Sequence, residues 1–369
     1  MTCSGFGSFT CNVCGAACPR PATAATREAW PCPECGASLR VRALIALLSE
    51  EILGVAMALP DFPVLKGVRG IGMSDAPELA KRLAKKFDYT NTFYHQAPFF
   101  DITRPSEGDA GRYDFILSSE VMEHVPAPIQ RSFAALARML KPEGVLLLTT
   151  PYNVEGRTVE HFPELHEYTL ASLGGRVVLV NRRRDGQVEV FENLVFHGGP
   201  GSTLELRVFT ETSLRETIAA GGFPVLRMAA ENFPEFGVEH AETWSLPIAA
   251  RKGPRTPPAP ELALQYREAC RRALKAAHDA ADLQLEVEAR TEWAFKQEAD
   301  LQERTAWALH LVGEKKEALE AFEHEQKSAE EAWACVKSLD EELREARLAR
   351  ARLERRLWTR LGRRLGMVK

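Results

Sequence analysis

The sequence lacks any apolar run long enough to cross a membrane. Its most apolar stretch, residues 41–65, is interrupted by charged residues and by proline, whereas a spanning helix needs about 18 consecutive apolar residues. The N-terminal segment MTCSGFGSFTCNVCG has neither a basic region nor an apolar core, and a secretory signal peptide has both. We therefore expect a cytoplasmic protein, whose cysteines stay reduced unless they bind metal.

The sequence also lacks an overall excess of basic residues. A net charge of −4 argues against a protein wholly devoted to nucleic acid, although an average can hide a local patch. Apolar residues make up 45% of the chain and charged residues 27%, as in soluble proteins with a real core. The length of 369 residues allows two or three domains.

Proline is absent after residue 260, and only three glycines follow it. Dense Ala, Glu, Leu, Arg and Lys without proline predict long helix. The segments RTEWAFK (290–296) and RTAWALH (304–310) repeat at a spacing of 14 residues, which is two heptads and favours a coiled coil. A coiled coil predicts a homo-oligomer, either dimer or trimer, and the alternative is a long solvated single helix.

Cysteine is scarce outside the first 38 residues, which hold six of the eight. Two Cys-x-x-Cys pairs lie there, each followed by a glycine, and their members are Cys11, Cys14, Cys32 and Cys35. Two such knuckles can supply four thiolates to a tetrahedral Zn²⁺. We predict a closed structural zinc ribbon with no open coordination position. In this zinc ribbon Cys3 and Cys18 do not bind the metal. The alternative is that Cys11, Cys14 and Cys18 together bind a metal cluster.

Between these parts, apolar strand-like runs alternate with helical patterns. A glycine turn over residues 70–74 follows an apolar run and opens a helix over 76–87. Strands are predicted over residues 89–94, 113–117 and 145–150, and a further short strand is predicted to end at residues 99–101. A helix is predicted over residues 128–140. Strands that alternate with helices predict an α/β fold with a parallel, doubly wound sheet, whose ligands sit beyond the carboxyl ends of the strands.

The segment YDFILSSEVMEHV, followed by AALARMLKPEGVLLLTTPY, resembles class I S-adenosylmethionine-dependent methyltransferases. The resemblance covers roughly residues 64–250, where RVFTETSLRETIAAGGFPVLRM is similar to the closing helix and strand of that family. It implies a Rossmann-like domain that binds S-adenosylmethionine. It also implies cofactor contacts at positions matching the family motifs: Gly70, Gly72 and Ser74 in the loop, Asp101 at the adenine, and Ser118 and Glu120 at the methionine end.

The sequence departs from the family pattern at the second strand. The acidic residue that usually binds the ribose hydroxyls is absent, so Asn91, Thr92 or His95 would have to replace it. In the cofactor loop, Ser74 stands where the last glycine is usual. A degenerate, non-catalytic domain is therefore an alternative.

Two inserts after the fifth strand are expected to form the acceptor pocket. One reads as two strands around Asp185-Gly186, and the other is the glycine-rich segment 197–202. An aliphatic hydroxyl acceptor needs a general base, because its pKa lies far above 7. His161 and His124 are our candidate catalytic residues, with His166 and His197 as further histidines of the same region.

The last 26 residues are basic. Residues 344–369 contain ten Lys or Arg and two Glu, with leucine at every fourth position from Leu353 to Leu365 and Trp358 beside them. A basic amphipathic helix with an interfacial Trp favours an anionic membrane surface, and a basic arm for RNA or a protein partner is the alternative. The tail also resembles those of bacterial enzymes that build cell-surface polysaccharides, which implies polysaccharide-assembly enzymes as partners.

These features divide the chain into a zinc ribbon (1–38), a class I methyltransferase domain (39–252), a Pro-rich linker (253–260), a coiled coil (261–343) and a basic amphipathic tail (344–369). We expect an S-adenosylmethionine-dependent O-methyltransferase acting on a glycan or glycolipid precursor, or another small molecule, near the inner membrane. One alternative is an RNA methyltransferase that grips phosphates with the zinc ribbon and the basic tail, a role that Arg40 and Arg42 just after the ribbon would suit. The other is a non-catalytic scaffold with a degenerate methyltransferase fold.

Overall fold

The computed structural model describes residues 7–22, 26–197, 203–256, 259–310 and 316–364. These form two units, residues 1–263 and 264–369. Side chains from residue 354 onward lie outside the described part, as do residues 365–369, so the basic amphipathic tail stays a prediction. In the described residues no helix is both long and apolar enough to span a membrane.

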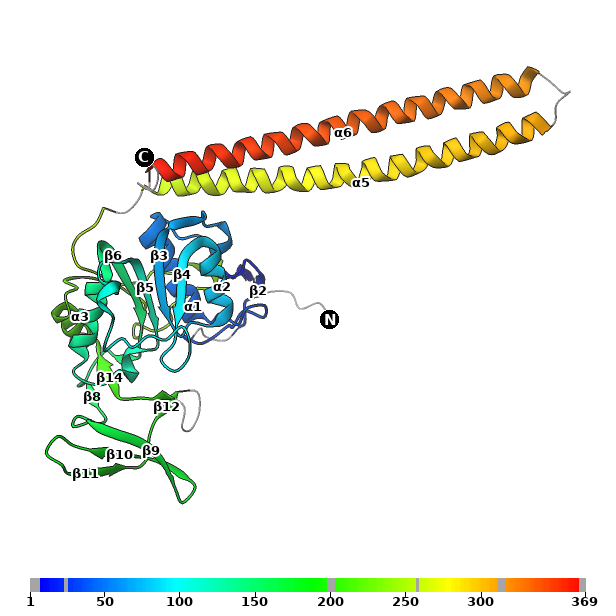
Figure 1. Cartoon of the computed structure of the whole chain (residues 1–369). Coiled ribbons are helices and arrows are strands. Elements are labelled where there is room, and N and C mark those ends of the chain that lie inside the picture. Colours follow the sequence, from blue (N-terminus) through cyan, green and yellow to red (C-terminus); the bar gives the residue numbers. More distant parts are fainter. Residues whose placement is uncertain (1–6, 23–25, 198–202, 257–258, 311–315, 365–369) are drawn as a thin grey trace. The chain divides into compact units, whose positions relative to one another are not determined.

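A six-stranded sheet forms the centre of the first unit, in the order β15-β16-β6-β5-β3-β4 (Figure 1). Its strands are β3 (Leu65–Met73), β4 (Phe87–Thr92), β5 (Tyr113–Ser119), β6 (Leu140–Thr149), β15 (Val225–Met228) and β16 (Ile248–Arg251). Strands β3 to β6 pair in parallel, whereas β16 is antiparallel to β6 and β15 is antiparallel to β16. The α/β class and the methyltransferase-like sheet are confirmed, with two antiparallel strands added at one edge.

Helices cover the sheet because its strands are apolar on both faces. They are α1 (Leu39–Leu53), α2 (Pro77–Lys86), α3 (Ile129–Met139) and α4 (Glu211–Ala220). Ile71, Ile116 and Leu146 share one core cluster with Phe133 of α3 and Leu214 of α4. Side chains alternate between faces along a strand, so residues 115 and 117 face the opposite side from Ile116.

The predicted glycine turn at 70–74 is wrong, because β3 continues through Met73. A Cβ atom at Gly70 would lie 2.2 Å from Cζ of Phe115. Phe115 and Tyr89, on the strands flanking β3, instead stack with ring centroids 5.8 Å apart. At Gly72 a Cβ atom would lie 1.8 Å from Oη of Tyr89. Both glycines therefore serve sheet packing, and the backbone leaves the sheet only at Ser74.

Other expected boundaries also shifted. The strand predicted to end at Asp101 is absent: Phe99 forms only an isolated bridge with Phe93, and Asp101 lies in a loop. The helix expected to run to residue 140 ends at Met139, and β6 starts at Leu140, earlier than expected.

Small elements complete the first unit. The ribbon pairs β1 (Ser8–Thr10) with β2 (Ala17–Pro19) in antiparallel fashion. A three-stranded insert sheet contains β9 (Glu167–Leu173), β10 (Arg176–Arg182) and β11 (Val188–Phe191), so the hairpin predicted around Asp185-Gly186 is confirmed. The remaining short strands are β7 (Tyr152–Asn153), β8 (Val159–Glu160), β12 (Phe196–His197), β13 (Thr203–Leu204) and β14 (Arg207–Thr210). Short 3-10 turns are η1 (Leu59–Asp61), η2 (Glu107–Asp109), η3 (Met122–His124) and η4 (Pro234–Phe236).

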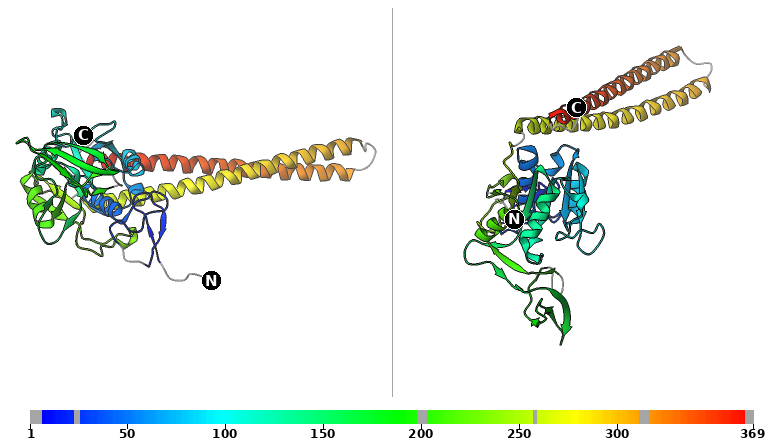
Figure 2. Two further views of the ribbon diagram at one scale, coloured as in Figure 1. Left: turned by 90° about the horizontal axis from the view of Figure 1, so that it is seen from below. Right: turned by 60° about the vertical axis from the view of Figure 1, so that its left-hand side comes forward.

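The second unit is an antiparallel pair of helices, α5 (Pro260–His310) and α6 (Lys316–Arg364), which run side by side in every view (Figures 1 and 2). The rings of Phe295 and Trp333 meet edge to face at 5.3 Å. Arg347 Nη2 donates to Gln284 Oε1 over 3.2 Å. The predicted long helix is thus present as two helices whose packing partner lies in the same chain. A homo-oligomer stays a prediction, and the repeat by itself no longer requires one.

Candidate functional site

The four predicted cysteines converge within the ribbon. Among the described residues, Cys11, Cys14, Cys32 and Cys35 place their sulfur atoms within 4.8 Å of one another. The Sγ atoms are 3.7 Å apart between Cys11 and Cys35 and 3.5 Å apart between Cys14 and Cys32. Zn–S bonds of about 2.3 Å around a tetrahedral ion place neighbouring sulfurs about 3.8 Å apart. The cluster therefore fits zinc. Cys18 lies outside this group of four, and Cys3 lies outside the described residues.

The two knuckles have the same backbone geometry. The Gly15 N–H donates to the Cys11 carbonyl over 2.7 Å, and the Gly36 N–H donates to the Cys32 carbonyl over 2.8 Å. Gly15 and Gly36 have φ angles of 86° and 72°, the left-handed region in which glycine is least strained. This explains why a glycine follows each Cys-x-x-Cys pair.

The buried side chain of Arg42 connects the ribbon to the rest of the first unit. Arg42 is fully buried, and its guanidinium donates to the carbonyls of Trp30 (2.7 Å), Ala37 (2.6 Å) and Gly237 (3.1 Å). Arg40 donates to Ser119 at the end of β5 and pairs with Glu28. The two arginines that would suit RNA phosphates are thus engaged inside the protein.

Backbone strain marks the carboxyl edge of the sheet. Ser74 follows β3 with φ 60°, and Glu120 follows β5 with φ 55°. Non-glycine residues rarely adopt this conformation, and it often accompanies functional sites. Glu120 Oε1 accepts from Arg27 Nη2 at 2.5 Å, so the part of the ribbon between its two Cys-x-x-Cys pairs reaches the same edge.

The predicted cofactor residues are only partly available. Ser118 is fully buried, and its Oγ has no hydrogen-bond partner among the described residues. Asp101 Oδ1 accepts from the N–H (2.8 Å) and the hydroxyl (2.7 Å) of Thr103, bonds that do not involve Oδ2. Asn91 is committed elsewhere, since its Oδ1 accepts from the Asp75 N–H and its Nδ2 donates to the Asp75 carbonyl. A direct ribose contact from Asn91 is therefore not supported.

Asp75, which the sequence did not single out, is buried beside the loop. Its carboxylate accepts from the Tyr89 hydroxyl. Burial raises the pKa of Asp75 to about 6 from an ordinary value of 3.8, although the Tyr89 bond and Arg40 act in the opposite direction. Between these two values the folded protein holds a proton that the unfolded chain releases, so stability falls as the pH rises through this window.

We expect Asp75→Asn to remove this loss of stability. Relative to wild type, the variant should gain up to about 3 kcal/mol in the free energy of unfolding between about pH 4 and pH 7, since one pKa unit is worth about 1.4 kcal/mol. Urea unfolding of both proteins across this range measures the difference, and acid effects common to both proteins cancel. Parallel pH curves would contradict the assignment.

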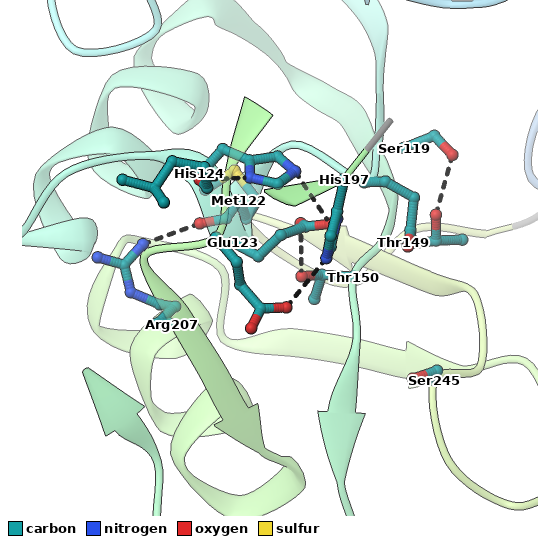
Figure 3. Close-up of polar contacts among 12 residues, drawn as sticks. Ser119, Met122, Glu123, His124, Thr149, Thr150, His197, Arg207 and Ser245 are labelled. Carbon is teal, nitrogen blue, oxygen red and sulfur yellow. Dashed lines mark hydrogen bonds and ion pairs between the residues drawn. The ribbon is translucent and has the colours of Figure 1, made fainter. Parts of the chain in front are cut away.

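Two acidic and three histidine side chains gather beyond the ends of β5 and β6. Figure 3 labels Glu123, His124 and His197 of this cluster. His161 Nε2 and His197 Nε2 each lie 3.0 Å from one oxygen of Glu205. His124 Nε2 and His197 Nδ1 each lie 3.7 Å from Oε1 of Glu123. The structure thus joins both predicted catalytic histidines and His197 in one cluster. His166 lies instead at the start of the insert sheet, where its N–H donates to Asn181.

Glu123 and Glu205 were missed as site residues. Glu123 is fully buried and its Oε2 accepts from the Thr150 hydroxyl at 2.9 Å. Burial, and secondarily the negative charge of Glu120, raise the pKa of Glu123 to about 8. Glu123 stands in the quoted motif EVMEHV, so its neighbour His124 could have signalled it. Glu205 carries no local signal, because only folding of the insert places it beside His161.

A buried arginine supports the turn that carries Glu123 and His124. Arg207 forms a bidentate pair with Glu160, through Nε at 2.7 Å and Nη2 at 3.2 Å. Its Nη1 donates to the carbonyls of Met122 and Val125, which flank the turn. Arg207 therefore fixes the turn through its backbone, as Figure 3 shows for Met122.

Comparison with known proteins agrees with this architecture. Residues 65–227 match the sequence model of a methyltransferase domain family. The ubiquinone biosynthesis O-methyltransferase of Marinobacter nauticus is 35% identical over 83 residues, which are 22% of this chain and 34% of that protein. The chain thus spans about a third of the length of this curated relative.

Solved structures with similarity to the chain include proteins named as methyltransferases. A Burkholderia thailandensis 1,6-didemethyltoxoflavin-N1-methyltransferase, with S-adenosylhomocysteine bound, aligns at 14% identity over 57% of this chain and 79% of its own, with a TM-score of 0.32. A sugar N-methyltransferase from Streptoalloteichus aligns at 13% identity over 50% and 81%, with a TM-score of 0.30. The family match is the stronger finding, and together with the observed sheet it supports a methyltransferase domain over residues 65–227.

Proposed function

We propose that this protein transfers a methyl group from S-adenosylmethionine to an oxygen atom of its acceptor. The observation that carries the proposal is the His–Glu cluster at the carboxyl ends of β5 and β6, within a domain that matches methyltransferases. Ligands of doubly wound α/β folds bind at this edge of the sheet. The O-methyltransferase activity named for the Marinobacter relative supports an oxygen acceptor.

Ser118 and Asp101 fit the cofactor at its two ends. The buried Ser118 Oγ, which has no hydrogen-bond partner in the part of the chain that the structure describes, offers a donor and acceptor at the end of β5. Asp101 Oδ2 is suited to accept from an exocyclic amine, while Oδ1 is held by Thr103. When bound, S-adenosylmethionine supplies the electrophilic methyl group. The chain's own task is to orient the acceptor oxygen and to take its proton.

His161 is the best placed general base. Its side chain is 27% exposed, and Glu205 holds its Nε2 at 3.0 Å. When the neutral ring of His161 carries its proton on Nε2 and donates it in a hydrogen bond to Glu205, Nδ1 has a free lone pair. Nδ1 can then accept a proton from the acceptor hydroxyl, and the Glu205 carboxylate stabilises the resulting imidazolium. His124 is less accessible, with 12% of its side chain exposed, and its Nδ1 bonds the Leu204 carbonyl. We therefore assign the base role to His161.

For the acceptor we propose a glycan or a lipid-linked glycan precursor. Support comes from the insert that carries Glu205 and His197 beside the sheet edge, and from the likeness of the tail to those of polysaccharide-building enzymes. An RNA acceptor is less favoured, because Arg42 is buried and Arg40 is paired with Glu28. A cytoplasmic location at the membrane surface belongs to the same proposal.

Calorimetric titration with S-adenosylhomocysteine tests the proposal. We expect wild-type protein to bind, and Asp101→Asn to weaken affinity about tenfold, since a hydrogen bond to a charged group is worth about 1.5–3 kcal/mol. Asp114→Asn is the matched control: Asp114 lies at the start of β5, at the far edge of the sheet, and accepts from Lys141 at 2.7 Å. Its affinity should equal that of wild type.

Absence of binding at millimolar ligand would favour the non-catalytic scaffold. If binding is present, transfer of a labelled methyl group from S-adenosylmethionine to an envelope glycolipid extract, assayed beside total RNA, separates the two acceptor classes. Label found only in RNA would overturn the glycan assignment.

A further inference from the structure

Three ligand-type atoms of the cluster converge on one point. Glu123 Oε1 lies 3.7 Å from His124 Nε2 and 3.7 Å from His197 Nδ1. All three atoms lie within 4.8 Å of one another. Figure 3 shows the adjacent residues Glu123 and His124 beside His197, which comes from a different segment of the chain. Around a tetrahedral metal with ligand bonds of about 2.0–2.2 Å, neighbouring ligand atoms are about 3.4 Å apart. The two distances from Glu123 Oε1 differ from this by a few tenths of an ångström, and the two imidazole nitrogens lie within 4.8 Å of each other.

The other ring nitrogen of each histidine lies at hydrogen-bond distance from a group that is not one of these three side chains. His124 Nδ1 bonds the Leu204 carbonyl at 2.8 Å. Because a carbonyl can only accept, the proton lies on Nδ1 and Nε2 carries the lone pair. His197 Nε2 lies 3.0 Å from Glu205 Oε2. Such carbonyl–histidine and carboxylate–histidine contacts are the usual outer support of metal ligands.

The Glu123 oxygen that faces the two imidazoles, Oε1, has no hydrogen-bond donor among the described residues. The Glu123 side chain is fully buried. The nearby arginines are used by other carboxylates, Arg27 by Glu120 and Arg207 by Glu160. An isolated buried carboxylate is costly unless a cation pairs with it. The point where the three atoms meet is where such a cation would lie.

We propose that Glu123, His124 and His197 bind a divalent transition-metal ion. Two imidazoles and one carboxylate suit zinc, manganese, iron or cobalt and leave a coordination position open. This site is distinct from the ribbon, whose four thiolates would close the coordination of their ion. Use of the open position to bind the acceptor oxygen rests on the proposed function, whereas the metal site itself does not.

The test is titration of cobalt chloride into the full-length protein with zinc in its ribbon, followed by visible absorption and calorimetry. We expect about one Co²⁺ per chain, with ligand-field bands but no thiolate charge transfer. Glu123→Gln and His197→Gln, both close in shape to the original residues, should each lower the affinity at least 100-fold, because outer-shell changes alone cost about 10–100-fold. His166→Gln, a histidine of the insert outside the cluster, should bind as wild type does.

Absence of Co²⁺ uptake by the wild type, or unchanged affinity in Glu123→Gln, would overturn the metal site. Charge-transfer bands would show instead that Co²⁺ had replaced the ribbon zinc, which also counts against the site. Circular dichroism confirms that each variant is folded. Cobalt uptake without S-adenosylhomocysteine binding would remove the proposed function and leave the metal site standing.

Discussion

Protein purified without chelator is expected to contain about one zinc ion per chain, and Cys32→Ser is expected to lose it. With one of four thiolates removed, the remaining three hold the ion far less tightly, and structural zinc contributes folding free energy directly, about 10 kcal/mol or more in isolated fingers. We therefore expect the ribbon to unfold in this variant. Elemental analysis measures the zinc, and hydrogen exchange over residues 7–38 measures the unfolding.

The matched control is Cys18→Ser. It makes the same substitution in the same ribbon, at a buried cysteine outside the group of four, and should keep its zinc. Zinc in Cys32→Ser at the wild-type level, or wild-type protein devoid of zinc, would contradict the ribbon assignment. Unfolding should also reach the cofactor edge, because Arg27 and Arg40 hold Glu120 and Ser119, so affinity for S-adenosylhomocysteine should fall as well.

Arg207→Met is expected to lower the free energy of unfolding of the first unit by about 3 kcal/mol, the lower end of the cost of removing one partner of a buried ion pair, because the Glu160 side chain left behind is 32% exposed. The Arg207 side chain is fully buried, so its loss leaves the Glu160 carboxylate and two backbone carbonyls without their donor. Urea unfolding gives the total effect. Hydrogen exchange should show the greatest loss of protection around residues 120–126, where the supported turn lies.

Arg215→Met provides the comparison. Arg215 pairs with Glu211 one helical turn away, and its side chain is 43% exposed. Exposed pairs of this kind contribute about 0.3–0.5 kcal/mol, so this variant should unfold nearly as the wild type does. Equal effects of the two substitutions would mean that Arg207 does not support the turn.

Predictions from the sequence succeeded where the determining interactions are local. The spacing within each Cys-x-x-Cys pair and its following glycine lies inside a single turn, so the knuckles of Cys11 and Cys32 could be read directly. The long C-terminal helices follow from residue-by-residue propensity and the absence of proline. The order of strands and helices between residues 65 and 227 follows from hydrophobic periodicity.

Predictions failed where a neighbouring strand decides the outcome. Gly70 and Gly72 resemble a loop in one dimension, but the rings of Tyr89 and Phe115 occupy the space beside them and keep the chain in the sheet. The two-heptad repeat predicted a helix partner without saying where it lies, and the chain folds back to supply its own. Such choices depend on packing between distant segments, which a local pattern does not encode.

The sequence alone determined the ribbon cysteines, the alternation of strands and helices, and the histidines His124 and His161 as candidates. Only the tertiary structure brought His197 and Glu205 of the insert to Glu123, more than seventy residues away in the chain. Only the fold made Arg207 a buried support of that turn and placed Asn91 in hydrogen bonds with the Asp75 backbone. The physical reason is that carboxylates and imidazoles gain their chemistry from desolvation and from partners, and both are set by long-range packing.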